Sequence, residues 1–167
     1  MSSLDPFGLN RRSLLILPLA LAACGFTPAY GPKGPAKNLQ GAIFAADPTN
    51  KNGFDLVERI EQQFGPPQAP RYDLSYQIDV QSSGVGITPD YSITLYNLAG
   101  TVAWTLTDRA SGKTLTGGTV QSFTTYSASG STVSGLTAED DAALRLMRIL
   151  GDQITQRIIA TSGDWAT

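Results

Sequence analysis

The side chain with the most definite chemistry is the thiol of Cys24, the one cysteine in this chain of 167 residues. An apolar run that begins at Leu14 leads up to it, and two positive charges, Arg11 and Arg12, precede that run. A basic start, a short apolar stretch and small residues at its end are the parts of a cleavable export signal. The run is interrupted by Pro18 and is shorter than the roughly 20 residues that cross a bilayer as a helix. We therefore expect any membrane anchor to be covalent.

The residues before the thiol match the lipobox of bacterial lipoprotein signals, in which an aliphatic residue stands three positions before the cysteine with small residues between them. The four residues are Leu21, Ala22, Ala23 and Cys24. In this pattern the thiol receives a diacylglycerol, the chain is cut before the cysteine, and the new amino group is acylated. Because each buried methylene contributes about 0.8 kcal/mol, three acyl chains hold a protein on a membrane far better than one. We expect these lipids on Cys24 and no other cofactor.

Two further points concern this signal. The alternative interpretation is an ordinary secretory signal that ends beside a buried cysteine, and palmitate labelling separates the two. The residue after the thiol is Gly25, whereas lipoproteins that stay in the inner membrane commonly have aspartate there. We therefore expect the outer membrane, with the protein facing the periplasm.

The composition excludes most catalytic chemistry. The chain contains no histidine, and lipid consumes its one thiol, so Ser-His-Asp and Cys-His hydrolysis, histidine-ligated zinc and internal disulfides are ruled out. The acidic run Glu139-Asp140-Asp141 is explained by a helix N-terminus, where negative charge gains roughly 0.3 to 1 kcal/mol. Asp73 and Asp79 share a strand face but lie about 20 Å apart at roughly 3.3 Å per residue. We expect no enzyme and no metal site, although carboxylate catalysis stays formally open.

The charge balance and the length set the class of protein. After removal of residues 1–23, ten Lys and Arg remain (12 less Arg11 and Arg12) against thirteen Asp and Glu (14 less Asp5). Nucleic acid is an unsuitable partner, because duplex binding needs a basic face. Residues 24–38 are rich in proline and glycine and predict a lipidated flexible tether. Residues 39–167 suffice for one domain.

Periodicity predicts the elements of this domain. Alternation of apolar and polar residues predicts a half-buried strand from Tyr72 to about Gln81. Helical spacing predicts a helix over 53–64, capped by Asn52 and ended by Gly65, and a long helix that starts near Thr137 and includes Gly151. The remaining predicted elements are a short buried strand over 42–45, a strand over 91–107 with a bulge between Asn97 and Gly100, and a strand over 114–127.

This order predicts an α+β fold: a single four-stranded, mostly antiparallel sheet with two α-helices packed on one face. The sheet's other face is then polar and open to solvent or a partner. The polar strand positions that indicate this are Ser75, Gln77, Thr94, Thr105, Thr107, Thr119 and Thr125. Tyr72, Tyr76 and Trp104 are expected in the core or at the sheet edge, and the position of Trp165 is left open.

The sequence Cys24-Gly25-Phe26-Thr27-Pro28, followed by strand, helix, three strands and helix, resembles the lipopolysaccharide-assembly lipoprotein family LptE. The resemblance covers the whole mature chain, and its specific part is the lipobox with Cys-Gly-aromatic, the short strand and the strand from Tyr72 to Val80. It implies a plug, scaffold and assembly partner of the outer-membrane β-barrel LptD in lipopolysaccharide transport. It also makes lipopolysaccharide a candidate ligand.

One implication of the resemblance meets a difficulty. Recognition of phosphate-bearing sugars calls for Lys or Arg, but the segments Ser82–Asp90 and Ser127–Thr137 contain neither. Lipid contact would then use residues such as Arg71, Arg109 or Lys113, or scaffolding outweighs lipid binding. We favour the second and assign no lipid-binding residue. The runner-up function is an auxiliary lipoprotein of another envelope lipid transporter of the ABC type.

Overall fold

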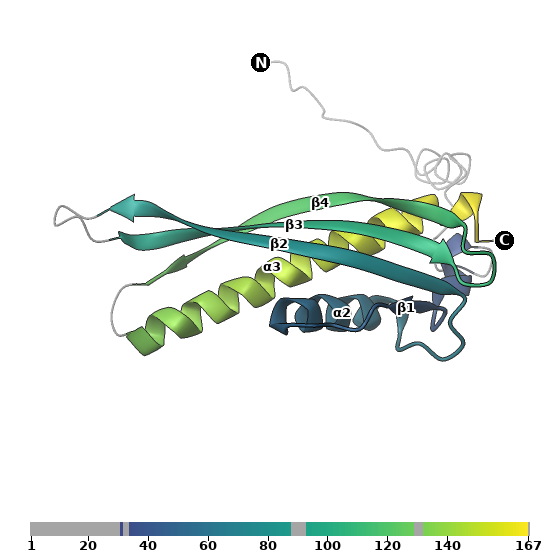
Figure 1. Ribbon diagram of the computed structural model, residues 1–167, viewed down its shortest axis with the longest axis horizontal. Helices are drawn as coiled ribbons and strands as arrows, with labels where there is room; N and C mark the ends of the chain where they lie inside the picture. Colours follow the sequence, from purple (N-terminus) through teal and green to yellow (C-terminus); the bar gives the residue numbers. More distant parts are fainter. Residues whose placement is uncertain (1–30, 32–33, 88–92, 129–131, 167) are drawn as a thin grey trace, which may run out of the picture.

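The computed structural model describes residues 31, 34–87, 93–128 and 132–166. Four strands form one sheet, and two α-helices lie together on one of its sides (Figure 1). In chain order the elements are η1 (Pro35–Leu39), β1 (Ile43–Ala45), α2 (Lys51–Phe64), β2 (Tyr72–Ile87), β3 (Ile93–Asp108), β4 (Thr114–Ser127), α3 (Thr132–Thr161) and η2 (Ser162–Asp164). The α+β fold with a mostly antiparallel sheet is confirmed.

The strands stand in chain order, β1-β2-β3-β4. Only β1 and β2 run parallel, and they pair over three residues, from Ile43 with Tyr72 to Ala45 with Leu74. β2, β3 and β4 are long antiparallel neighbours. The core faces of these strands carry apolar side chains, among them Leu74, Val102 and Val120, each at most 1% exposed. The alternation of apolar and polar residues in the sequence therefore correctly predicted one buried face and one solvent-exposed face of the sheet.

The first α-helix, α2, is capped by Asn50 and not by the predicted cap Asn52. The Asn50 side chain accepts a hydrogen bond from the backbone N–H of Gly53 at 2.9 Å, which satisfies one of the free donors at the helix start. The helix ends at Gly65, whose φ of 76° favours glycine. Leu56, Ile60 and Phe64 form its buried stripe.

The long helix α3 approaches its neighbours closely through two glycines. A Cβ on Gly100 of β3 would lie 2.9 Å from Cδ2 of Leu146, so glycine lets α3 come down onto the sheet. A Cβ on Gly151 would lie 3.0 Å from Cγ of Arg59 in α2. Beside this contact, Arg59 forms a two-pronged ion pair with Asp152, with N···O distances of 2.8 and 3.0 Å. The glycine that interrupts the helical pattern in sequence is thus where the two helices touch.

A Gly151→Leu substitution is expected to destabilise the domain. The added side chain has no room between α2 and α3, and forcing extra methylenes into a packed contact costs about 1 to 3 kcal/mol. Urea unfolding of the variant should therefore show a lower midpoint with an unchanged slope. Gly163→Leu is the control, because a Cβ there meets no atom within 4 Å. Equal stability of the two variants would contradict the close contact.

Two local predictions are wrong. The pairing of β3 with both neighbours runs without a shift from Tyr96 to Leu106, so no bulge lies between Asn97 and Gly100. The irregularities fall at Gly84 to Ile87 of β2 and near Thr107. The core face does not switch, because Leu95 stays on the outer face and is 40% exposed. The second error is the start of α3, which begins at Thr132. Thr137 lies inside the helix and donates to the carbonyl of Val133.

Residues at the N-terminal end of the described domain pack onto it. Ala36 and Leu39 of η1 are fully buried. The proline-rich and glycine-rich composition predicted that residues 35–38 belong to the flexible tether, whereas in the structure they form η1, in which Ala36 is buried. No helix in the described ranges is long and apolar enough to cross a membrane.

Candidate interaction surfaces

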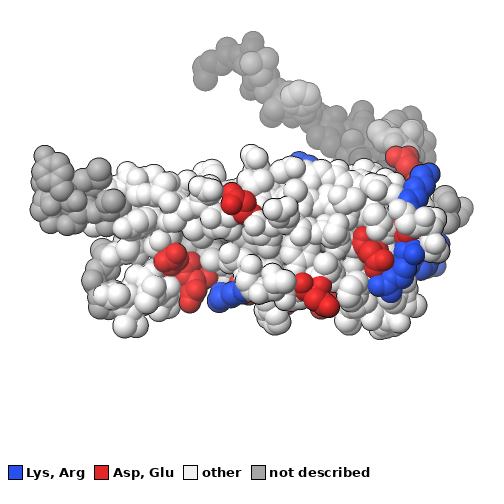
Figure 2. All heavy atoms as spheres, in the orientation of Figure 1, with Lys and Arg blue, Asp and Glu red and all other residues white. Residues whose placement is uncertain are grey.

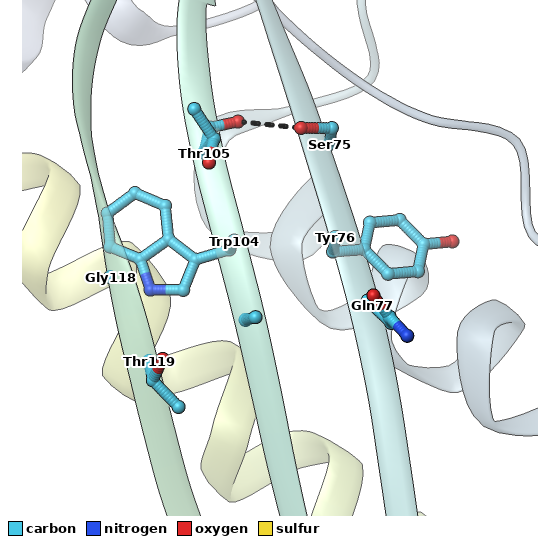
Figure 3. Close-up of a pocket in the computed structure, with 8 residues that line it drawn as sticks. Ser75, Tyr76, Gln77, Trp104, Thr105, Gly118 and Thr119 are labelled. Carbon is cyan, nitrogen blue, oxygen red and sulfur yellow. Dashed lines mark hydrogen bonds between the residues drawn. The ribbon is translucent and has the colours of Figure 1, made fainter.

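The face of the sheet opposite α2 and α3 carries no described helix. Ser75, Gln77, Ala103, Thr105 and Thr119 line a shallow concavity of about 480 Å³ on it (Figure 3). Ser75 Oγ donates a hydrogen bond to the Thr105 carbonyl at 3.4 Å. The side chains of Ser75, Gln77, Thr105 and Thr119 offer hydroxyls and an amide, so the concavity can hold a polar partner. The sequence predicted this polar face, and the exposure of Ser75, Gln77 and Thr119 confirms it. The prediction is wrong for Thr94, because its neighbour Leu95 lies on the outer face and strand alternation turns Thr94 to the other.

The aromatic residues named from the sequence belong to the core. Tyr72 and Trp104 are 2% and 3% exposed. Trp165, whose place the sequence left open, packs edge-on against Tyr72 with ring centroids 5.1 Å apart. Tyr76 is half-buried, and Figure 3 shows its ring pointing away from Trp104. Burial raises the pKa of Tyr76, and the charge of Asp47 adds to this. Neither the Tyr76 hydroxyl nor Trp104 Nε1 finds a hydrogen-bond partner among the described residues.

The three cations named as alternative lipid contacts lie together at one end of the sheet. The backbone N–H of Arg109 donates to the carbonyl of Arg71, and the Lys113 carbonyl accepts from Asp108. In Figure 2 most of the visible Lys and Arg gather at this end, where β3 ends and β4 begins. Much of this charge is already compensated, because Arg109 pairs with Asp73 at 2.7 Å.

A second acid at this end is also satisfied by its neighbours. Hydrogen bonds from the side chain and the backbone of Ser111 hold the pKa of Asp108 below its usual value. With two carboxylates beside the three cations, the cluster has little net charge to offer an anionic ligand.

The acidic run Glu139-Asp140-Asp141 lies on the second turn or later of α3, and the first turn contains no acid. The predicted explanation by the helix N-terminus is therefore wrong in its position, because the helix starts five residues earlier than Thr137. Asp141 instead pairs with Arg145 one turn further on, at 2.9 Å. In the part of the chain that the structure describes, no three His, Cys, Asp or Glu side chains converge as metal ligands would.

A groove beneath the far half of the sheet was not predicted. It has a volume of about 430 Å³ and is lined by Asn52, Val80, Leu98, Leu136, Glu139, Asp140 and Ala143. It exists because α2, with 14 residues, is about 21 Å long at 1.5 Å per residue. The 16 residues of β2 extend about 53 Å at 3.3 Å per residue. The sequence could have indicated this groove, because the predicted helix is shorter than the predicted strand that it packs against.

The predicted lipidation site lies outside the described residues, as do Leu21, Ala22 and Ala23. The chain enters the described domain through η1, which lies against η2 next to the start of β2.

Fold and surfaces together define a small α+β domain with a polar sheet face. The family model for lipopolysaccharide assembly, LptE, matches residues 40–158 of the chain. The chain therefore belongs to the LptE family. No curated protein matches it in sequence.

Solved structures share this fold at low sequence identity. A Caulobacter crescentus CB15 protein aligns with a TM-score of 0.66 and 17% identity, over 78% of this chain and 96% of that one. Rare lipoprotein B from Shewanella oneidensis aligns with a TM-score of 0.57 and 13% identity, over 75% and 98% of the two chains. Lipoprotein B from Nitrosomonas europaea gives 0.55 and 13%, over 74% and 84%. These likenesses support the fold.

Proposed function

We propose that the protein is an outer-membrane lipoprotein that acts without catalysis as plug, scaffold and assembly partner of the LptD β-barrel in lipopolysaccharide transport. The observation that carries this proposal is the family match over residues 40–158. The chemistry of the surfaces agrees with it. The concavity on the sheet offers hydrogen-bonding hydroxyls and an amide to a protein partner.

Scaffolding is the primary role in this proposal, and contact with lipopolysaccharide is secondary. The three cations that could bind phosphates lie where β2 begins and β3 ends, and one of them is engaged by a carboxylate. The groove at the far half of the sheet is lined by the acids Glu139 and Asp140. Acidic side chains repel phosphate, so this groove suits a polypeptide better than the anionic part of a glycolipid.

Affinity purification of the lipidated protein from outer membranes tests the function. We expect a large β-barrel of the LptD type as the main protein that is purified together with it. The runner-up function, an auxiliary lipoprotein of another lipid transporter, predicts transporter ATPase components in place of the barrel. That result would replace the proposal.

A further inference from the structure

The sheet leaves one long strand edge open. β1 pairs only with Tyr72 to Leu74, whereas β2 continues to Ile87. Past Leu74 no described strand lies on this side of β2, which Figure 1 shows running on beyond β1. An edge strand presents a row of N–H and C=O groups that another chain can pair with. The stretch from Ile78 to Ser83 precedes the irregularity at Gly84 and has neither proline nor lysine, the residues that usually block such an edge.

The register identifies the backbone groups that face outward along this edge. The backbone N–H of Tyr72 donates to the carbonyl of Ala42, and the carbonyl of Leu74 accepts from the N–H of Ala46. The backbone N–H and C=O groups of the even-numbered residues of β2 therefore point toward β1. Because this direction alternates along a strand, the N–H and C=O of Ile78, Val80 and Ser82 face outward beyond the end of β1. The backbone N–H and C=O groups of the odd-numbered residues point toward β3.

The opposite edge of the sheet is already occupied. Three side chains of α3 donate to outward carbonyls of β4: Arg157 to Thr119 at 2.8 Å, Gln153 to Gln121 at 3.3 Å, and Arg145 to Thr125 at 3.4 Å. The match has a geometric reason. Four helical residues advance about 6 Å and two strand residues about 6.6 Å, so one row of helix side chains reaches alternate carbonyls. Among the described residues, α3 thus protects the β4 edge, while no strand pairs with β2 past Leu74.

The surroundings of the free edge indicate what it pairs with. Side chains of an added strand that point below the sheet would enter the groove beside Val80 and Leu98, which is apolar at its base and acidic at Glu139 and Asp140. Those that point above it would meet Asp79, which is exposed and forms no ion pair within the described part of the chain. A complementary strand has alternating apolar residues and a Lys or Arg opposite Asp79.

A second copy of this chain does not meet that requirement. In an antiparallel pair of two copies centred on this edge, the two Asp79 carboxylates would lie opposite or diagonal to each other, where like charges destabilise a sheet. We propose that the β2 edge from Ile78 to Ser82 pairs with an extended, basic and apolar segment of the partner protein, adding a fifth strand to the sheet. This proposal rests on the proposed function, in which the partner is the LptD-type barrel.

A proline at Ser82 tests the proposal in the lipidated protein co-expressed with the barrel. Ser82 is exposed and its N–H faces outward, so proline removes no bond to β3 but blocks an added strand. We expect Ser82→Pro to lower barrel recovery about tenfold or more. The matched control is Gln121→Pro on β4, where the N–H also faces outward and recovery should stay at the wild-type level. Circular dichroism checks that both variants are folded.

Hydrogen exchange in the wild-type complex gives an independent readout. The amides of Ile78, Val80 and Ser82 should become protected when the barrel is bound, while those of Gln77, Asp79 and Gln81 should already be protected in the free protein. Asp79→Lys should weaken recovery, because it places a positive charge opposite the basic residue of the added strand. Equal effects of the two proline variants, or no alternating protection, would overturn the added strand and leave the function standing. Wild-type protein that recovers no barrel would overturn the function itself.

Discussion

Cys24→Ala is expected to release the protein from the membrane. The variant should incorporate no labelled palmitate and should move from the membrane to the soluble fraction, because the acyl chains supply the anchoring free energy at about 0.8 kcal/mol per buried methylene. No helix in the described residues can replace this anchor by spanning the bilayer. The measurement is palmitate labelling of growing cells, followed by fractionation and mass spectrometry of the mature N-terminus.

The control for this experiment is Ala23→Gly, which keeps a small residue before the cleavage point and should retain the label. Its retention would show that a change within the lipobox does not by itself stop export. Palmitate on the Cys24→Ala variant, or an unmodified thiol on wild-type protein from native cells, would contradict lipidation of Cys24.

Leu146→Ala is expected to cause the largest loss of stability of any single change considered for this protein. Leu146 is fully buried between α3 and the sheet, and its Cδ2 lies against Gly100. Truncation of a buried leucine costs about 2 to 5 kcal/mol, through lost burial and the cavity left behind. Because Gly100 has no side chain to move into the space, the cavity should collapse poorly and the cost should fall in the upper part of that range. Denaturant unfolding of the domain measures it.

Leu136→Ala is the matched control, since it makes the same change on the same helix at a side chain that is 60% exposed. Its effect should stay within about 0.5 kcal/mol, as is usual for surface positions. Similar losses for Leu146→Ala and Leu136→Ala would contradict the packing of α3 against β3.

Local sequence was a good guide wherever one short stretch of chain decides the structure. Alternation in Tyr72–Gln81 predicted which face of β2 is buried, and Gly65 marked the end of α2. The cap of α2 was misplaced by two residues because Asn50 and Asn52 both suit a helix start, and the chain geometry chooses between them. The start of α3 was misplaced because Thr137 and the acids after it resemble a cap, although helical backbone continues back to Thr132.

The surface features also divide into those that local sequence predicts and those that depend on contacts between distant residues. The polar positions of the open face could be predicted because strand alternation alone places them there. The absence of histidine and the single thiol excluded most catalytic sites from composition alone. In contrast, the grouping of Arg71, Arg109 and Lys113 depends on the hydrogen bond between β2 and the turn after β3, which joins residues far apart in sequence.

The sequence by itself determined the kinds and order of the elements and the polar and apolar faces of the strands, because these depend on residues a few positions apart. The lipobox at Cys24 stays a prediction. Only the tertiary structure decided that α3 meets the sheet at Gly100 and that α3 covers the carbonyls of β4. It alone decided that β1 is too short to cover β2. These features depend on the relative lengths and the close packing of elements that lie far apart along the chain. A local sequence pattern does not encode how such elements meet in space.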